Sequence, residues 1–197
     1  TAKHLGIPVI YETDDLMLEL PPQSCCKLSE TMKRAIRHMV GLADVVTCST
    51  AALQAKLNDL NPNTRVIENY AVPFSLKEIQ ACRDTTPHAV IVNTDYFKLA
   101  DRKQELFDAL REAILTLGYR VSFLGSVDEM MARLSSEFPS QVVIDASFTP
   151  WRKRFLAGLM QRGINVAIVP LEDNVHHSFK SDIKFMDFAS VGIPGIF

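Results

Sequence analysis

The sequence contains no apolar segment long enough to cross a membrane, and charge of neither sign dominates it. Its 197 residues carry a formal net charge of −2, whereas a general nucleic-acid binder carries a strongly basic surface. A transmembrane helix needs roughly 20 consecutive apolar residues, and no signal peptide is visible. With 47% hydrophobic and 22% charged residues, the composition is typical of a soluble, ordered protein. We therefore expect a cytoplasmic protein that does not bind nucleic acid.

Cysteine and histidine are sparse and lack the spacing of metal sites. The adjacent cysteine pair is not a CxxC motif, so a reduced cytosolic setting is the simplest interpretation. His176 and His177 are neighbours, so on a regular element their side chains diverge and would rarely bind one metal ion. The sequence therefore predicts no metal site and no cofactor. The four cysteines are Cys25, Cys26, Cys48 and Cys82.

Several common functional motifs are also missing. The sequence has no GxGxxG, no Walker A and no GxSxG pattern. Dinucleotide-binding proteins, P-loop nucleotidases and α/β-hydrolases are normally marked by these motifs. The sequence therefore gives no motif evidence for any of these three classes of protein.

Apolar strand candidates alternate with amphipathic helices along the whole chain. This alternation predicts an α/β fold of two Rossmann-like units with parallel, doubly wound sheets. Ser49 or Thr50 and Asp101 are the expected helix caps. The expected strands are 7–11, 45–48, 65–67, 89–92, 120–124, 142–145, 165–169 and 193–197. The expected helices are 28–40, 51–57, 102–117, 127–138, 151–161 and 178–190.

A connection between two domains is expected near the middle of the chain. The stretch 69–88 contains Pro73, Pro87 and a polar RDTT tract, which fits a linker better than a sheet element. We predict an amino-terminal domain over 1–72, a connection over 73–87 and a carboxyl-terminal domain over 88–197. Because the chain starts at Thr1 and stops where a strand enters the sheet, we expect both domains to be incomplete.

The last 33 residues place positive charge at the start of an expected helix. His176, His177 and Lys180 crowd the first turn of the helix over 178–190. Cations there oppose the positive end of the helix dipole, so the placement is unfavourable unless a bound anion compensates it. This stretch therefore predicts a phosphate or carboxylate ligand.

The loop NTDYFK, residues 93–98, is a second anion-seeking segment. It follows an expected strand and precedes a helix that has Lys98 and Lys103 near its start. Two such loops in one domain are what a diphosphate needs, because its charge is shared between separate donors. The simpler alternative is that these lysines are only solvated.

Polar residues directly follow the other strands, at the edge where open α/β sheets bind ligands. Paired acids after the first strand could steer a substrate hydroxyl, act as a base or hold a metal ion; alternatively, one acid caps a turn and the other is solvated. Helix capping alone is a sufficient explanation of the second set. The third set could face a cleft between two domains, or it could form a simple turn. An aromatic FTPW stretch at 148–151 fits either a base-binding wall or packing. The three polar sets are Glu12, Thr13, Asp14 and Asp15; Ser49 and Thr50; and Glu68 and Asn69.

Taken together, three stretches resemble group 1 (family 4-like) glycosyltransferases of GT-B fold. In that family, the nucleotide-sugar site consists of a strand ending in Pro-Leu, a KS-x-x-K helix, a run of small residues and a GIP sequence. The segment VAIVPLEDNVHHSFKSDIKFMDFASVGIPGIF of this chain is similar to that pattern. The end of their amino-terminal domain resembles GLADVVTCSTAALQAKL followed by RVIENYAVP, and an upstream strand with a DD turn resembles GIPVIYETDD. The resemblance covers the chain in the expected order, and it implies that the chain is a piece lacking both ends of such a protein.

The resemblance implies transfer of a sugar from a nucleoside-diphosphate donor to a glycan, lipid-linked or other hydroxyl acceptor. It favours a retaining, metal-independent reaction and allows peripheral contact with the inner membrane. Asp187 stands where the family carries an acid that bonds the ribose, whereas Phe179 replaces the acid that often contacts the sugar. The implied catalytic residues are Asp14, Asp15 and Lys98. The implied donor-binding residues are Lys180, Ser181, Asp182, Lys184, Asp187, Asn93 and Thr94.

Two other functional classes stay open on the sequence alone. The chain could be a non-catalytic module that binds a nucleotide or sugar phosphate. It could also be a structural or regulatory α/β domain whose lysines and histidines are only solvated. Nucleotide binding and sugar transfer distinguish these three hypotheses.

Overall fold

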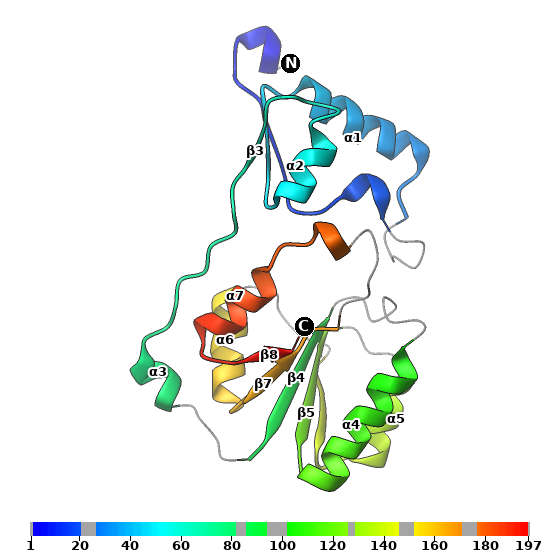
Figure 1. The fold of residues 1–197 in the computed structure, drawn as a ribbon, viewed down its shortest axis with the longest axis vertical. Coiled ribbons are helices and arrows are strands. Elements are labelled where there is room, and N and C mark those ends of the chain that lie inside the picture. The colour runs from blue at the N-terminus through cyan, green and yellow to red at the C-terminus, as the bar shows by residue number, and fades with distance from the viewer. Residues whose placement is uncertain are drawn as a thin grey trace. The chain divides into compact units, whose positions relative to one another are not determined.

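The computed structural model shows an α/β protein with two parallel sheets (Figure 1). It describes residues 2–20, 27–81, 86–93, 102–125, 129–145, 152–170 and 177–196. The chain divides into two compact units. The first contains the described residues up to Tyr70 together with 177–182, and the second contains those from Ala71 to Pro170 and from Ile183 onward.

The first unit is built on a three-stranded parallel sheet of order β1-β2-β3. Its strands are β1 (Ile10–Thr13), β2 (Val45–Cys48) and β3 (Thr64–Val66). The helical elements are the 3₁₀ turns η1 (Ala2–Leu5), η2 (Met17–Glu19) and η4 (His177–Phe179), with helices α1 (Glu30–Leu42) and α2 (Ala51–Leu57).

Helix capping and apolar burial explain these elements. Ser29 and Thr50 accept hydrogen bonds from backbone amides in the first turns of α1 and α2, which satisfies donors that a helix start leaves free. Leu53, Val46 and Val40 are fully buried at the centre of the unit's core. The sheet and helices are therefore held by one apolar layer.

The second unit has a five-stranded parallel sheet of order β6-β5-β4-β7-β8. Its strands are β4 (His88–Asn93), β5 (Arg120–Gly125), β6 (Val142–Asp145), β7 (Val166–Ile168) and β8 (Gly195–Ile196). Its helices are α3 (Leu76–Ala81), α4 (Lys103–Leu117), α5 (Glu129–Glu137), α6 (Arg152–Gln161) and α7 (Ile183–Ser190).

Two apolar clusters, one on each face, make this second sheet doubly wound. Alternate residues along a strand point to opposite faces, and in β4 Ile91 packs with α4 and α5 whereas Val90 packs with α6 and α7. The order of the strands reverses between β4 and β7, because β5 and β6 lie on one side of β4 and β7 lies on the other. Such a reversal is the usual ligand-binding point of an open α/β sheet.

The predicted α/β class with parallel, Rossmann-like units is confirmed, whereas the predicted start of the last helix is wrong. The last helix begins at Ile183 rather than Ser178, because Phe179 is buried in the core of the first unit instead of lying on a helix face. The predicted connection over 73–87 contains helix α3. Within the described part of the chain, no helix combines the length and the apolar character needed to cross a bilayer.

Candidate functional site

In the first unit, the ends of all three strands contact the short segment 177–182. After β1, the Asp15 carboxylate forms an ion pair with the Lys180 ammonium, with 2.5 Å between Oδ1 and Nζ. After β2, Thr50 Oγ1 donates a hydrogen bond to the carbonyl oxygen of Phe179 at 3.2 Å. After β3, Asn69 Nδ2 donates to Ser181 Oγ at 2.7 Å. The segment is thus attached along the carboxyl edge of the sheet.

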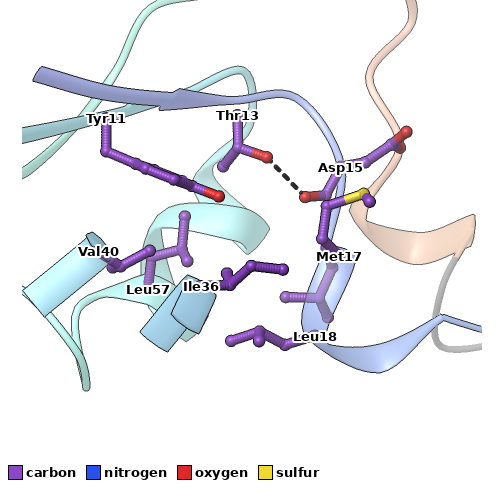
Figure 2. A pocket seen from close by; sticks show the side chains of 9 residues that line it. Tyr11, Thr13, Asp15, Met17, Leu18, Ile36, Val40 and Leu57 are labelled. Atoms are coloured by element: carbon purple, nitrogen blue, oxygen red, sulfur yellow. Dashed lines mark hydrogen bonds between the residues drawn. The ribbon is translucent and has the colours of Figure 1, made fainter. Parts of the chain in front are cut away.

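Local bonds fix the turn that carries Asp15. Thr13 Oγ1 donates to the main-chain carbonyl of Asp15 at 2.8 Å, and Figure 2 shows the Asp15 carboxylate turned away from the neighbouring apolar side chains. Asp14 is exposed, whereas Asp15 keeps 36% of its side-chain surface. The turn therefore separates two adjacent acids, and only Asp15 reaches Lys180.

A small pocket with a cavity volume of about 10 Å³, partly open to solvent, lies behind this turn (Figure 2). Most of its lining is apolar, which leaves the Tyr11 hydroxyl in partly dry surroundings, and this burial raises the pKa of Tyr11. Burial likewise raises the pKa of the Cys48 thiol at the end of β2. Both groups are therefore neutral at physiological pH, and neither is a ready base or nucleophile. The lining residues are Tyr11, Thr13, Asp15, Leu16, Met17, Leu18, Ile36, Val40 and Leu57.

In the second unit, a lysine lies at the point where the strand order reverses. Lys184, in the first turn of α7, donates from Nζ to the carbonyl oxygen of Val92 at 3.2 Å. Val92 is the penultimate residue of β4, so this ammonium lies at the carboxyl end of the strand beside the reversal. Asp187 follows three residues later on the same helix, and both side chains are partly buried. A cation and a carboxylate are therefore presented by one helix face.

The predicted residues fall into three groups. Asp14, Asp15, Lys180, Ser181 and Asp182 belong to the first unit, whereas Asn93, Lys184 and Asp187 belong to the second. Asp15 and Lys180, predicted for different roles, are bonded to each other. Thr94, Lys98, Asp101, His176 and the FTPW stretch lie outside the described residues, as do Cys25, Cys26 and Cys82.

Two hydrogen bonds at these sites were difficult to predict from the sequence. Asn69 could be read as an ordinary turn residue, yet it bonds Ser181 across 112 positions of sequence. Thr50, rather than Ser49, caps α2, and its hydroxyl also bonds Phe179. In the sequence, each of these residues could be recognised only as a polar residue that follows a strand. Its hydrogen-bond partner depends on the fold.

Comparison with known proteins adds no family assignment. The chain matches no protein-family model, and a search of curated proteins finds no significant match. Within the described ranges, no group of three His, Cys, Asp or Glu side chains is arranged to hold a metal ion. The features that bear on function are therefore the fold and the polar residues at the carboxyl edges of the two sheets.

Proposed function

We propose that the chain is part of a glycosyltransferase that moves a sugar from a nucleoside-diphosphate donor to a hydroxyl acceptor on a glycan or lipid-linked compound. The observation that carries the proposal is the hydrogen bond between Lys184 and the carbonyl of Val92. This bond places an ammonium group where the strand order of the second unit reverses. Nucleotides commonly bind doubly wound sheets at such a point.

The chemistry of sugar transfer requires positive charge at this place. As the bond between the sugar and the diphosphate breaks, the leaving nucleoside diphosphate gains negative charge. An ammonium held in advance stabilises that charge without reorganising during the reaction. Lys184 Nζ donates to the Val92 carbonyl at 3.2 Å, and this bond holds the positive charge at the end of β4.

Asp187 supports the nucleotide part of the proposal. It lies one helical turn after Lys184, so both residues are neighbours on the surface of α7. A carboxylate can accept bonds from the two ribose hydroxyls, whereas Lys184 meets the phosphates. The spacing KS-x-x-K followed by an acid also resembles the donor site of group 1 glycosyltransferases.

Phe179 sets a limit on how the donor sugar is recognised. It occupies the position at which related sequences often carry a sugar-contacting acid, and here its side chain is 91% buried in the first unit's core. Other residues must therefore contact the sugar.

A panel of nucleotide sugars, with released nucleoside diphosphate as the readout, tests the proposal. Release with one donor and an added acceptor supports it, whereas tight nucleotide binding without any release favours a non-catalytic binding module.

A further inference from the structure

The ion pair between Asp15 and Lys180 uses the same chemistry as phosphate binding by lysine. A carboxylate oxygen and a phosphate oxygen are both anionic acceptors of charge-assisted hydrogen bonds. Asp15 Oδ1 already holds Lys180 Nζ at 2.5 Å. An anionic ligand that binds Lys180 must therefore share the ammonium with Asp15 or replace it.

We propose that Asp15 acts as an internal competitor: its carboxylate occupies the anion-binding position of Lys180, and a phosphate group of a nucleoside diphosphate displaces it. This inference rests on the proposed function, because that function supplies the ligand. It differs from a role for Asp15 as a base, since the carboxylate here controls ligand affinity rather than proton transfer.

Solvent exposure makes the exchange feasible. Lys180 and Asp15 retain 31% and 36% of their side-chain surface, and ion pairs this accessible contribute little to stability. A diphosphate carries more charge than one carboxylate, so its bond to Lys180 is the stronger of the two. Replacing Asp15 with a ligand oxygen therefore costs little.

Ser181 gives the same segment a second donor. Asn69 Nδ2 donates to Ser181 Oγ at 2.7 Å, so the oxygen acts as an acceptor in this bond. The hydroxyl hydrogen is then directed elsewhere and can bond a ligand oxygen. Burial of Phe179 and the bond from Thr50 to its carbonyl hold the main chain just before these two side chains. Lys180 and Ser181 are thus presented together from a fixed segment.

The proposal predicts opposite effects from removing the two partners of the pair. Asp15→Asn removes the competitor and a nearby like charge, so UDP, GDP and inorganic pyrophosphate should bind about two- to tenfold more tightly. Lys180→Met should weaken the same ligands. The side-chain exchange at Asp15 leaves the turn intact, because Thr13 bonds the main-chain carbonyl.

Titration calorimetry with these three ligands tests the proposal. Asp59→Asn is the matched control, since Asp59 is an exposed acid of the same unit that follows α2. Asp15→Glu keeps the carboxylate and should bind like the unaltered chain. If circular dichroism shows that Asp15→Asn is unfolded, Asp15→Ser replaces it.

Each outcome separates this inference from the proposed function. Tighter binding by Asp15→Asn, with no change in Asp59→Asn, supports the internal competitor. Equal or weaker binding by Asp15→Asn overturns it without contradicting the proposed function, provided that the unaltered chain binds nucleotide. If neither the unaltered chain nor Asp15→Asn binds any of the three ligands, both are overturned.

Discussion

Lys180 and Asp15 form an ion pair although 165 positions of sequence separate them. Because about a third of each side chain is exposed, water screens the pair. We expect a double-mutant cycle with Lys180→Met and Asp15→Asn to give a coupling free energy of about 0.2–1 kcal/mol. Chemical denaturation of the four proteins measures it. A coupling of several kcal/mol would identify the pair as a structural lock that a ligand cannot exchange.

A buried histidine links β4 to β5 in the second unit. His88 Nδ1 donates to the carbonyl of Arg162 at 3.0 Å, which makes Nε2 the acceptor for the Ser122 hydroxyl at 2.9 Å. We expect His88→Leu to lower the free energy of unfolding by about 1–3 kcal/mol, because the buried Ser122 hydroxyl and the partly buried Arg162 carbonyl lose this partner. His88→Gln can restore one bond and should recover part of the loss in urea denaturation. A neutral effect of His88→Leu would show that these bonds contribute nothing.

The turn after α7 needs a glycine. Gly192 has a φ of +70°, and a Cβ atom at this position would lie 2.9 Å from Cγ2 of Ile79. Gly118 is an uncrowded comparison. It has a similar φ of +67°, and a Cβ atom at this position would have no heavy atom of the described residues within 4 Å. We expect Gly118→Ala to cost about 1–2 kcal/mol from backbone strain and Gly192→Ala to cost about 1–3 kcal/mol more from the clash.

Thermal and urea denaturation of these two variants separate strain from crowding. Adding Ile79→Ala removes the clashing methyl group, so the extra cost of Gly192→Ala should fall in that background. Equal costs at Gly118 and Gly192 would contradict the close approach of Ile79.

The loop before β2 should contribute to acid sensitivity. The amide of Val9 donates to Asp44 Oδ2 at 2.8 Å, and this bond, with a smaller contribution from Lys3, holds the pKa of Asp44 below its ordinary value of 3.8. A lowered pKa in the folded state stabilises the fold above the unfolded pKa, and this contribution is lost as pH falls through the folded pKa. Asp44→Asn should therefore lower stability at neutral pH, and its difference from the unaltered protein should shrink in acid. A difference that does not vary with pH would contradict the assignment.

The fold class was predictable because local and global signals agree. The strand and helix at 45–48 and 51–57 were predicted with the bounds that the structure shows, since a β-branched run, a capping hydroxyl and apolar helical spacing all coincide there. Around Phe179, the local signal and the tertiary packing conflict. Helical period favoured a helix through this residue, but its ring is buried in the first unit's core, and the helix begins only at Ile183.

The partners of the site residues were less predictable than their positions. Polar residues after strands marked Asp15, Thr50 and Asn69, because ligand-facing edges follow from the α/β pattern. Their bonds to Lys180, Phe179 and Ser181 depend on how the segment 177–182 packs, and no sequence periodicity encodes that packing. The same holds for Lys184, whose partner is a main-chain carbonyl and therefore leaves no mark in the residue types.

Calorimetric titration of the chain with UDP and GDP, compared with its Lys184→Met variant, tests the nucleotide site most directly. Lys77→Met, which alters an exposed lysine of α3 in the same unit, is the matched control. We predict that the unaltered chain and Lys77→Met bind one of the two nucleotides equally well, and that Lys184→Met binds it about tenfold or more weakly, as expected for a lost charge-assisted bond. Failure of the unaltered chain to bind either nucleotide, or equal binding by Lys184→Met, would contradict the account.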